Sequence, residues 1–274
     1  MLTLSKIRQR MASEENGKNP AGKMLILDFS LKGMEWHFID AASGETSSRR
    51  VGFGASEEKI LTRIENTVYD NPSLSDDIPA LILLSSPYFL CFPSDMEEDE
   101  ILDTASRCFN LENEDIFLTE FMPGVTAASG LCAGFRSFVS RTFPGIPTIH
   151  SCAVLTQSNS VAPAPDEERF MVSRGNAVTN FAVMRSGKLL HASCHTEREG
   201  NDIVYFIFKI WNECRLDPKE ATLYIDAEKE VRDEILPMLR KHIDFVRILP
   251  APSHGFSAPL PLPAALAYKN FSNQ

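Results

Sequence analysis

Two stretches of the sequence repeat the same order of apolar segments, turns and helix signals, and this repeat constrains the fold more than any other feature. In the first stretch, three short apolar segments lie between residues 24 and 52, a helix-spaced apolar stripe covers 56–69, and a buried apolar run covers 80–84. The same order returns from residue 170, at an offset of 141 to 146 residues. Apolar segments bounded by turns predict strands, and apolar residues three or four apart predict a helix. The chain is therefore expected to contain two halves that share a βββαβ plan.

The connections between these segments predict how the strands are arranged. Short turns at Lys32-Gly33 and Ser186-Gly187 join only antiparallel neighbours. The helices expected at 56–69, with Ser56 as its N-cap, and at 200–214 give enough chain for crossovers between parallel strands. We therefore predict an α/β fold in which each half has a mixed sheet, antiparallel over its first three strands and parallel thereafter.

Further elements are expected after each repeated unit. In the first half, Ser94 and Glu97 form a capping-box pair that predicts a helix running to residue 109. The first half is also expected to contain a hairpin at 116–132, a helix at 135–142, a strand at 147–149 and a helix from 151. The second half is expected to contain a helix at 228–242 kinked at Pro237, a strand at 245–249 and a final helix at 264–270.

Changes in composition along the chain predict where the domains begin and end. Residues 1–23 are polar with little apolar content, so we predict a tail of low order. Proline and small polar residues replace the periodic pattern at 158–167, which predicts a linker. The expected division is a first domain at 24–157 and a second domain at 168–274.

Charge and apolar content exclude several classes of function. The chain has 27 basic and 37 acidic residues, a net charge of -10, and no long basic run, which argues against a nucleic-acid or anionic-membrane surface. The longest nearly apolar stretch, Ile203 to Trp211, is far shorter than the roughly 20 residues that a spanning helix needs. No apolar leader precedes the first half, so a cytoplasmic location is expected. The six cysteines form no C-x-x-C pair and are expected to be reduced residues of the core.

Four segments carry a resemblance to a known fold family: Leu25–Ser30, Ala182–His191, Leu223–Ala227 and Ala264–Lys269. Their order along the chain resembles the actin-like ATPase superfamily, which has a ribonuclease H-like fold of two similar βββαβα domains with nucleotide in the cleft between them. More narrowly, the chain is similar to a bacterial family of unknown function with this fold, distantly similar to the actin-like ATPase of type IV pilus assembly. The resemblance covers residues 24–274.

The resemblance implies that the first nucleotide loop follows the first strand. In the superfamily, a carboxylate there organises a hydrated metal ion, and backbone N–H groups contact phosphate. Here Asp28 and Ser30, followed by Lys32 and Gly33, stand at this position. The alternative interpretation is that Asp28 caps the junction between strand and turn.

The other two nucleotide loops depart from the superfamily pattern. The second normally carries a carboxylate, but this chain has Ser173, then Gly175 and Asn176, with Arg174 either replacing the charge of the metal or lying in a solvated turn. The third is normally a glycine pair that lets adenosine approach the backbone, but Asp226-Ala227 stands there.

Two interpretations of function follow from these loops. The first is a non-catalytic binding or scaffold protein with the actin-like architecture, an unidentified protein partner and no bound cofactor. The second is an ATP-binding switch, with Mg-ATP in a degenerate cleft and weak or no hydrolysis. The incomplete ATPase machinery favours the first, and no residue is assigned a catalytic role.

Two other clusters have alternative explanations. His191 and His195 are expected on one face of a strand together with Ser193, which suggests either a two-histidine metal site that lacks a third ligand or a surface pair. The acidic run at 97–100 fits the first turn of a helix, where the helix dipole favours carboxylates. Paired acid–base catalysis by this run would need opposed carboxylates in a cleft, so a solvated first turn is expected.

Overall fold

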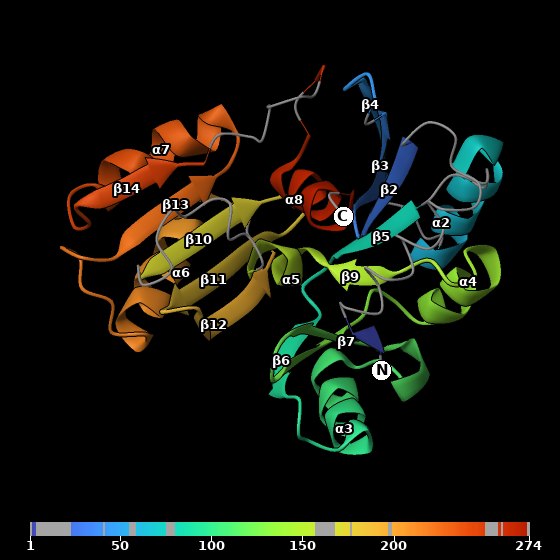
Figure 1. Cartoon of the computed structure of the whole chain (residues 1–274), viewed down its shortest axis with the longest axis horizontal. Coiled ribbons are helices and arrows are strands. Elements are labelled where there is room, and N and C mark those ends of the chain that lie inside the picture. Colours follow the sequence, from blue (N-terminus) through green and yellow to red (C-terminus); the bar gives the residue numbers. More distant parts are fainter. Residues whose placement is uncertain are drawn as a thin grey trace.

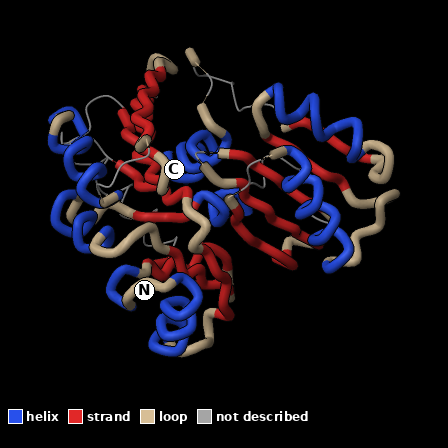
Figure 2. The backbone as a smooth tube through the Cα atoms, turned by 180° about the vertical axis from the view of Figure 1, so that it is seen from behind, coloured by secondary structure: helices blue, strands red, loops and turns tan. Residues whose placement is uncertain are grey.

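The computed structural model describes residues 2–3, 23–40, 42–54, 59–74, 80–156, 168–175, 177–196, 199–249, 257–258 and 260–272. Within these residues the strands form two five-stranded sheets and one four-stranded sheet (Figure 1). Helices cover the outer faces of the two larger sheets, as the view from behind shows (Figure 2).

The first five-stranded sheet belongs to the first half. It contains β2 (Lys23–Ser30), β3 (Gly33–Asp40), β4 (Thr46–Gly52), β5 (Ala80–Ser85) and β9 (Thr148–His150). The strand order is β4-β3-β2-β5-β9, in which β2, β3 and β4 pair antiparallel while β5 pairs parallel with β2 and β9. As expected from the sequence, the tight turns join antiparallel strands and the helical crossover joins parallel strands.

The second five-stranded sheet repeats this arrangement. It contains β10 (Arg169–Arg174), β11 (Thr179–Arg185), β12 (Lys188–His195), β13 (Thr222–Asp226) and β14 (Phe245–Ile248). Its order, β12-β11-β10-β13-β14, and its strand directions match those of the first sheet. The predicted α/β fold with two similar mixed sheets is confirmed.

Amphipathic helices cover the outer face of each sheet. In the first half, α2 (Ile60–Tyr69) and α4 (Phe135–Thr142) share an apolar cluster with the outward side chains of β2 and β5. In the second half, α6 (Gly200–Glu213) and α7 (Lys229–Leu239), which contains Pro237, pack in the same way on β10 and β13. Burial of these apolar faces is the main force that holds each helix on its sheet.

Two helices lie between the sheets and join the halves (Figure 1). α5 (Ser151–Thr156) and α8 (Leu262–Ser272) share one apolar cluster with inward residues of both sheets. A polar contact adds a second connection, because the Thr46 amide donates to Ser257 Oγ at 2.9 Å and Thr46 Oγ1 donates to the Ala258 carbonyl at 3.1 Å.

Three strands of the third sheet belong to an insertion between β5 and β9, and its fourth strand comes from the beginning of the chain. It contains β1 (Leu2–Thr3), β6 (Phe89–Pro93), β7 (Phe117–Met122) and β8 (Val125–Ser129) in the order β1-β7-β8-β6. α3 (Glu98–Phe109) packs on it, and the short 3-10 helices are η1 (Pro72–Leu74) and η2 (Asn113–Asp115). The hairpin expected at 116–132 is confirmed as β7 and β8.

Several local expectations need correction. Residues 2 and 3 of the expected low-order tail form β1, because β7 offers them a free edge, and two residues leave no periodic pattern in the sequence. The capping box is wrong: α3 begins at Glu98 without a side-chain cap, and Ser94 Oγ is 3.0 Å from Thr126 Oγ1 instead. Strand β6 was not expected. Lys23, the last residue of the expected tail, begins β2. Ser56, residues 1 and 4–22 of the tail, and the linker at 158–167 lie outside the described residues.

Candidate functional site

Asp28 is the buried centre of the first-half loop. It lies near the end of β2, it is 3% exposed, and its side chain is hydrogen-bonded with Ser85 on β5. Burial raises the pKa of this carboxyl to about 7; the Ser85 hydrogen bond opposes the rise, the charge of Glu35 adds to it, and that of Arg50 opposes it. Oδ1 of Asp28 has no hydrogen-bond partner among the described residues.

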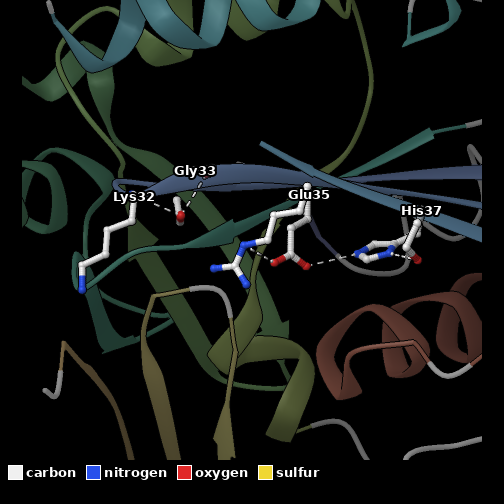
Figure 3. Close-up of polar contacts among 7 residues, drawn as sticks. Lys32, Gly33, Glu35 and His37 are labelled. Atoms are coloured by element: carbon white, nitrogen blue, oxygen red, sulfur yellow. Dashed lines mark hydrogen bonds and ion pairs between the residues drawn. The ribbon is translucent and has the colours of Figure 1, made fainter. Parts of the chain in front are cut away.

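The turn after β2 uses its polar groups internally. Ser30 Oγ donates to the Gly33 carbonyl at 2.9 Å and accepts from the Lys32 amide at 3.3 Å, while the Lys32 side chain extends away (Figure 3). A Cβ atom on Gly33 would lie 2.5 Å from the carbonyl oxygen of Val51. Glycine is therefore required at position 33 by the close pairing of β3 with β4, and this requirement does not depend on a phosphate.

The second-half loop is built around a hydrogen bond between Ser173 and Asp226. Ser173 Oγ on β10 donates to Asp226 Oδ2 on β13 at 2.7 Å. Burial raises the pKa of Asp226 to about 6; the Ser173 hydrogen bond opposes this, Glu228 adds to it and Arg232 opposes it. The Gly175 amide donates to the Val178 carbonyl at 2.9 Å, within the turn.

The two halves therefore contain the same pair of groups with their strands exchanged. In the first half the carboxyl of Asp28 is on β2, the first strand of its sheet in chain order, and the hydroxyl of Ser85 is on β5, the fourth. In the second half the hydroxyl of Ser173 is on the first strand and the carboxyl of Asp226 is on the fourth. The second loop has no carboxylate of its own, but Asp226 on the neighbouring strand places a carboxyl group beside Ser173.

Ion pairs flank these groups on both sides of the cleft. Arg50 Nε lies 3.2 Å from Glu35 Oε1, and Arg174 Nη1 lies 3.3 Å from Glu228 Oε2. Burial raises the pKa of Glu35, the charge of Arg50 opposes this, and the charge of Glu228 in the other half adds to it. The cleft therefore brings carboxylates of both halves within electrostatic range of each other, and the guanidinium groups of Arg50 and Arg174 already have acidic partners.

A small cavity lies between the turns of the two halves. Its volume is about 160 Å³, and it is lined by Lys32 and Ser85 from the first half and by Ala177, Val178 and Thr196 from the second. Ligand pockets for drug-sized molecules typically have roughly 300–1,000 Å³. The cavity therefore matches a group smaller than a nucleotide.

The sequence-predicted site residues are thus only partly brought together. Asp28 is buried beside Ser85, which lines the small cavity together with Lys32, and Ser173 and Asp226 bond to each other. Ser30 and Gly33 serve the turn, and a Cβ atom on Gly175 would meet nothing closer than Pro263 Cγ at 4.0 Å. Asn176 lies outside the described residues.

Sequence reasoning missed Glu35, His37 and Arg50 as part of this face (Figure 3). His37 Nδ1 lies 2.8 Å from Ser48 Oγ, its Nε2 lies 4.0 Å from Glu35 Oε2, and burial lowers the pKa of His37 to about 4. The signal was present in the sequence, because residues 35 and 37 alternate with Met34, Trp36 and Phe38, and a strand places alternate residues on one face.

The histidine pair on β12 forms no metal site with the residues that the structure describes. His191 Nε2 lies 2.8 Å from Ser193 Oγ, and the ring of His195 stacks on Phe206 with centroids 4.0 Å apart. In the described part of the chain, no group of three or more His, Cys, Asp and Glu residues is placed to hold a metal ion. These contacts agree with the interpretation of a packed surface pair.

Comparison with known proteins agrees with this architecture. The sequence profile of a family described as "Protein of unknown function (DUF3822)" matches residues 12–246. The structure is similar to a Bacteroides thetaiotaomicron protein with an actin-like ATPase fold and unknown function, with a TM-score of 0.68 and 15% identity over 83% of this chain and 91% of that chain. It is also similar to the PilM-PilN type IV pilus biogenesis complex, with a TM-score of 0.60 and 12% identity over 90% of this chain and 98% of that chain. No curated protein matches the sequence.

These similarities confirm the resemblance drawn from the sequence: an actin-like ATPase fold, a family of unknown function, and a likeness to a type IV pilus protein. At 12–15% identity the solved structures establish the fold alone. None of the helices that the structure describes is long and apolar enough to cross a membrane.

Proposed function

Because this chain belongs to the DUF3822 family of proteins of unknown function and has the actin-like ATPase fold, we propose that it is a non-catalytic binding or scaffold protein that acts through its surfaces. The PilM-PilN complex provides a precedent for protein partnering on this fold. A cytoplasmic location and the division into two domains near residues 158–167 are parts of the same proposal.

The observation that carries this proposal is the hydrogen bond between Ser173 and Asp226. A hydroxyl stands in the second loop where the superfamily has a carboxylate, and the neighbouring carboxyl is held by that hydroxyl at 2.7 Å. Hydrolysis requires carboxylates that position a metal ion and an attacking water, and loss of such groups lowers rates by orders of magnitude. The remaining arrangement joins neighbouring strands within each half.

The charges of the cleft support the same conclusion. Glu35 and Glu228 add negative charge beside Asp28 and Asp226, and each glutamate has an arginine partner. A polyphosphate therefore meets carboxylates and arginines that are already paired, and the net charge of -10 offers no long-range attraction.

A second candidate function, an ATP-binding switch with weak or no hydrolysis, is favoured by one observation. The buried Oδ1 atom of Asp28 has no hydrogen-bond partner among the described residues, so it is available to a water, a cation or a protonated ligand. Binding of nucleotide at this position predicts a change in the angle between the halves.

Thermal unfolding with and without Mg-ATP separates these two functions. A ligand at 100 times its Kd stabilises the folded state by about 2.7 kcal/mol, which is readily measured as a rise in Tm. We expect no rise in Tm at millimolar Mg-ATP. Saturable micromolar binding that Asp28→Asn abolishes would overturn the proposal and favour the switch, while the exposed-site variant Asp70→Asn serves as the control.

A further inference from the structure

The outer surface of α6 differs from that of α2, although the two helices occupy the same place in the sheet repeat. Each is the crossover helix between the third and the fourth strand of its sheet in chain order. The middle of α2 exposes the polar side chains of Thr62 and Asn66. The middle of α6 exposes the ring of Tyr205, with Phe206 and Phe208 half-buried beside it. A polar surface is sufficient for a helix in this position, so the fold itself does not require the aromatic surface of α6.

Tyr205 lies at the centre of this aromatic surface. It is 62% exposed, more than any other large hydrophobic side chain in the described part of the chain. Its ring meets that of Phe206 edge-on with centroids 5.3 Å apart, and Phe206 stacks on His195 at 4.0 Å. The view from behind shows the two outer helices of the second half lying in front of their sheet (Figure 2). Exposed aromatic residues held by their neighbours are typical of protein interfaces.

Asp202 and Lys209 place opposite charges at the two ends of this surface. Both side chains are exposed. They are seven residues apart, which is nearly two turns of helix and about 10 Å along its axis. Residues at this spacing lie on the same face of a helix, with Tyr205 between them. The exposed face of α6 therefore runs from an acidic group through an aromatic ring to a basic group.

This order of groups is complementary to itself. A twofold axis perpendicular to α6, between positions 205 and 206, brings two copies of the helix together in antiparallel directions. Asp202 of one copy then lies level with Lys209 of the other, and symmetry produces the same contact a second time. The two Tyr205 rings meet near the axis, at the centre of the interface, where buried aromatic residues contribute most to affinity. A second copy of the chain thus complements both the charges and the aromatic ring of this face.

We propose that α6 forms the interface of a twofold-symmetric dimer of this chain, in which Tyr205 packs at the axis and Asp202 pairs with Lys209 of the second copy. Two copies with a net charge of -10 repel each other at long range, so we expect a reversible dimer that depends on the α6 contacts. Self-association goes beyond the proposed function, since it names a second copy of the chain as one partner and does not involve the nucleotide cleft.

Analytical ultracentrifugation of the full chain at micromolar concentrations measures the dimer directly. We expect a monomer–dimer equilibrium, and Tyr205→Glu should raise its Kd by roughly tenfold or more, because it places a charge at the buried centre of the interface. Tyr69→Glu is the matched control, since Tyr69 is 55% exposed on α2 and its ring also meets a neighbour edge-on, that of Phe138. The control should leave the Kd unchanged, and circular dichroism establishes that both variants are folded.

An exchange of charges tests the geometry of the pair. Asp202→Lys and Lys209→Asp each place like charges opposite each other in a homodimer, so each variant alone should dimerise several-fold more weakly than the parent chain. In an equal mixture the two variants should form a heterodimer about as tight as the parent dimer, because every contact then joins a lysine to an aspartate. Asp202 also lies in the first turn of α6, where the helix dipole favours a carboxylate. That effect acts within one copy and does not produce recovery on mixing.

Three results overturn the proposed dimer. They are a parent chain that stays monomeric, a dimer that Tyr205→Glu weakens no more than Tyr69→Glu does, and an equal mixture of the two charge variants that forms no heterodimer. The first result leaves α6 as a surface for a different protein, and the other two assign the dimer to another surface. The Mg-ATP titration bears on none of them, so the dimer and the proposed function fail separately.

Discussion

Ser173 on β10 donates a 2.7 Å hydrogen bond to Asp226 on β13, and the two residues stand directly opposite each other in the parallel pair. The first half holds Asp28 and Ser85 on the corresponding strands with the two chemical groups exchanged. A buried carboxyl without an ionic partner is costly, and a hydroxyl donor offsets part of that cost. Each half therefore supplies its own donor, which makes the carboxyls part of the structure of the cleft.

Replacement of Ser173 by alanine tests this relationship. The hydroxyl is the donor to Asp226, and its bond lowers the pKa of a carboxyl that burial raises to about 6. Ser173→Ala should reduce the free energy of unfolding by about 1–3 kcal/mol at pH 8, where Asp226 is charged, and by less at pH 5. Urea unfolding at the two pH values measures the difference.

A neutral hydroxyl pair provides the control for this experiment. Ser94 Oγ lies 3.0 Å from Thr126 Oγ1, in the four-stranded sheet and away from the cleft. Ser94→Ala should reduce stability by about 1 kcal/mol, equally at both pH values. If Ser173→Ala shows no larger effect at pH 8 than at pH 5, the role assigned to the hydroxyl is wrong.

The pH dependence of stability should reveal the buried carboxyl of Asp28. Its pKa is raised from 3.8 to about 7 in the folded state, so the folded chain binds this proton more tightly than the unfolded chain does. The resulting stability is fully present below pH 4 and is lost as the pH rises to 7, by an amount on the order of 4 kcal/mol. Asp28→Asn removes this loss and should make the variant more stable than the parent chain at pH 8.

The contribution of Asp28 is the difference between the unfolding free energies of the parent chain and of Asp28→Asn at each pH. Burial lowers the pKa of His37 and of His150 to about 4, and these two groups lose stability as the pH falls, opposite to Asp28. Urea unfolding from pH 5 to pH 8, with Asp70→Asn as an exposed control, isolates the contribution of Asp28. Parallel pH profiles for the parent and Asp28→Asn would contradict the prediction.

The repeat in the sequence was sufficient to predict the two mixed sheets, because turns and crossovers dictate strand direction locally. The helix at Phe135–Thr142 and the hairpin of β7 and β8 were also predictable, since each has its own periodicity. Strand β1 was not, because two residues have no period. Strand β6 was not, because the short apolar run Phe89–Pro93 does not by periodicity alone distinguish a strand from a buried helical segment. Both depend on a neighbouring strand edge that only the folded chain provides.

The site was harder to predict than the fold for a related reason. Asp28 and Ser173 could be located from their place after a strand, but their bonding partners lie on strands that are distant in sequence. The electrostatic repulsion between Glu35 and Glu228 acts between residues of the two halves, and no local pattern contains it. The resemblance implies a phosphate loop at Gly33, whereas the close neighbour of this glycine in the structure is the Val51 carbonyl.

The close contact at position 33 can be tested with Gly52 as the control. A Cβ atom at position 33 would lie 2.5 Å from the Val51 carbonyl oxygen, whereas a Cβ atom on Gly52 would meet nothing within 4 Å. Gly33 and Gly52 are register partners in β3 and β4. Gly33→Ala should lower stability by about 1–3 kcal/mol through backbone displacement, while Gly52→Ala should be nearly neutral. Equal Tm values for the two variants would show that the strands separate without cost.

His150 connects the first sheet to the helix between the halves, and its ring should be essential for that connection. Its Nδ1 accepts from the Cys152 amide at 3.1 Å, so Nε2 carries the proton and donates to the Ser86 carbonyl at 2.9 Å. The ring also stacks on Phe89 with centroids 4.5 Å apart. His150→Ala leaves two buried backbone groups unpaired and should destabilise the fold by about 3 kcal/mol at pH 7.

The acid limb of the stability profile separates this role of His150 from simple loss of volume. Burial lowers the pKa of His150 from 6.5 to about 4, so its contribution is complete above pH 6.5 and is lost as the pH falls toward 4. His150→Asn retains an acceptor for the Cys152 amide but no imidazole, so it should be more stable than His150→Ala and should lose less stability than the parent chain below pH 6.5. His37 remains in both variants, so part of the acid decline persists. His242→Ala, at an exposed position, serves as the control variant. An unchanged acid limb in both His150 variants would contradict the lowered pKa of His150 and the neutral ring inferred from its hydrogen bonds.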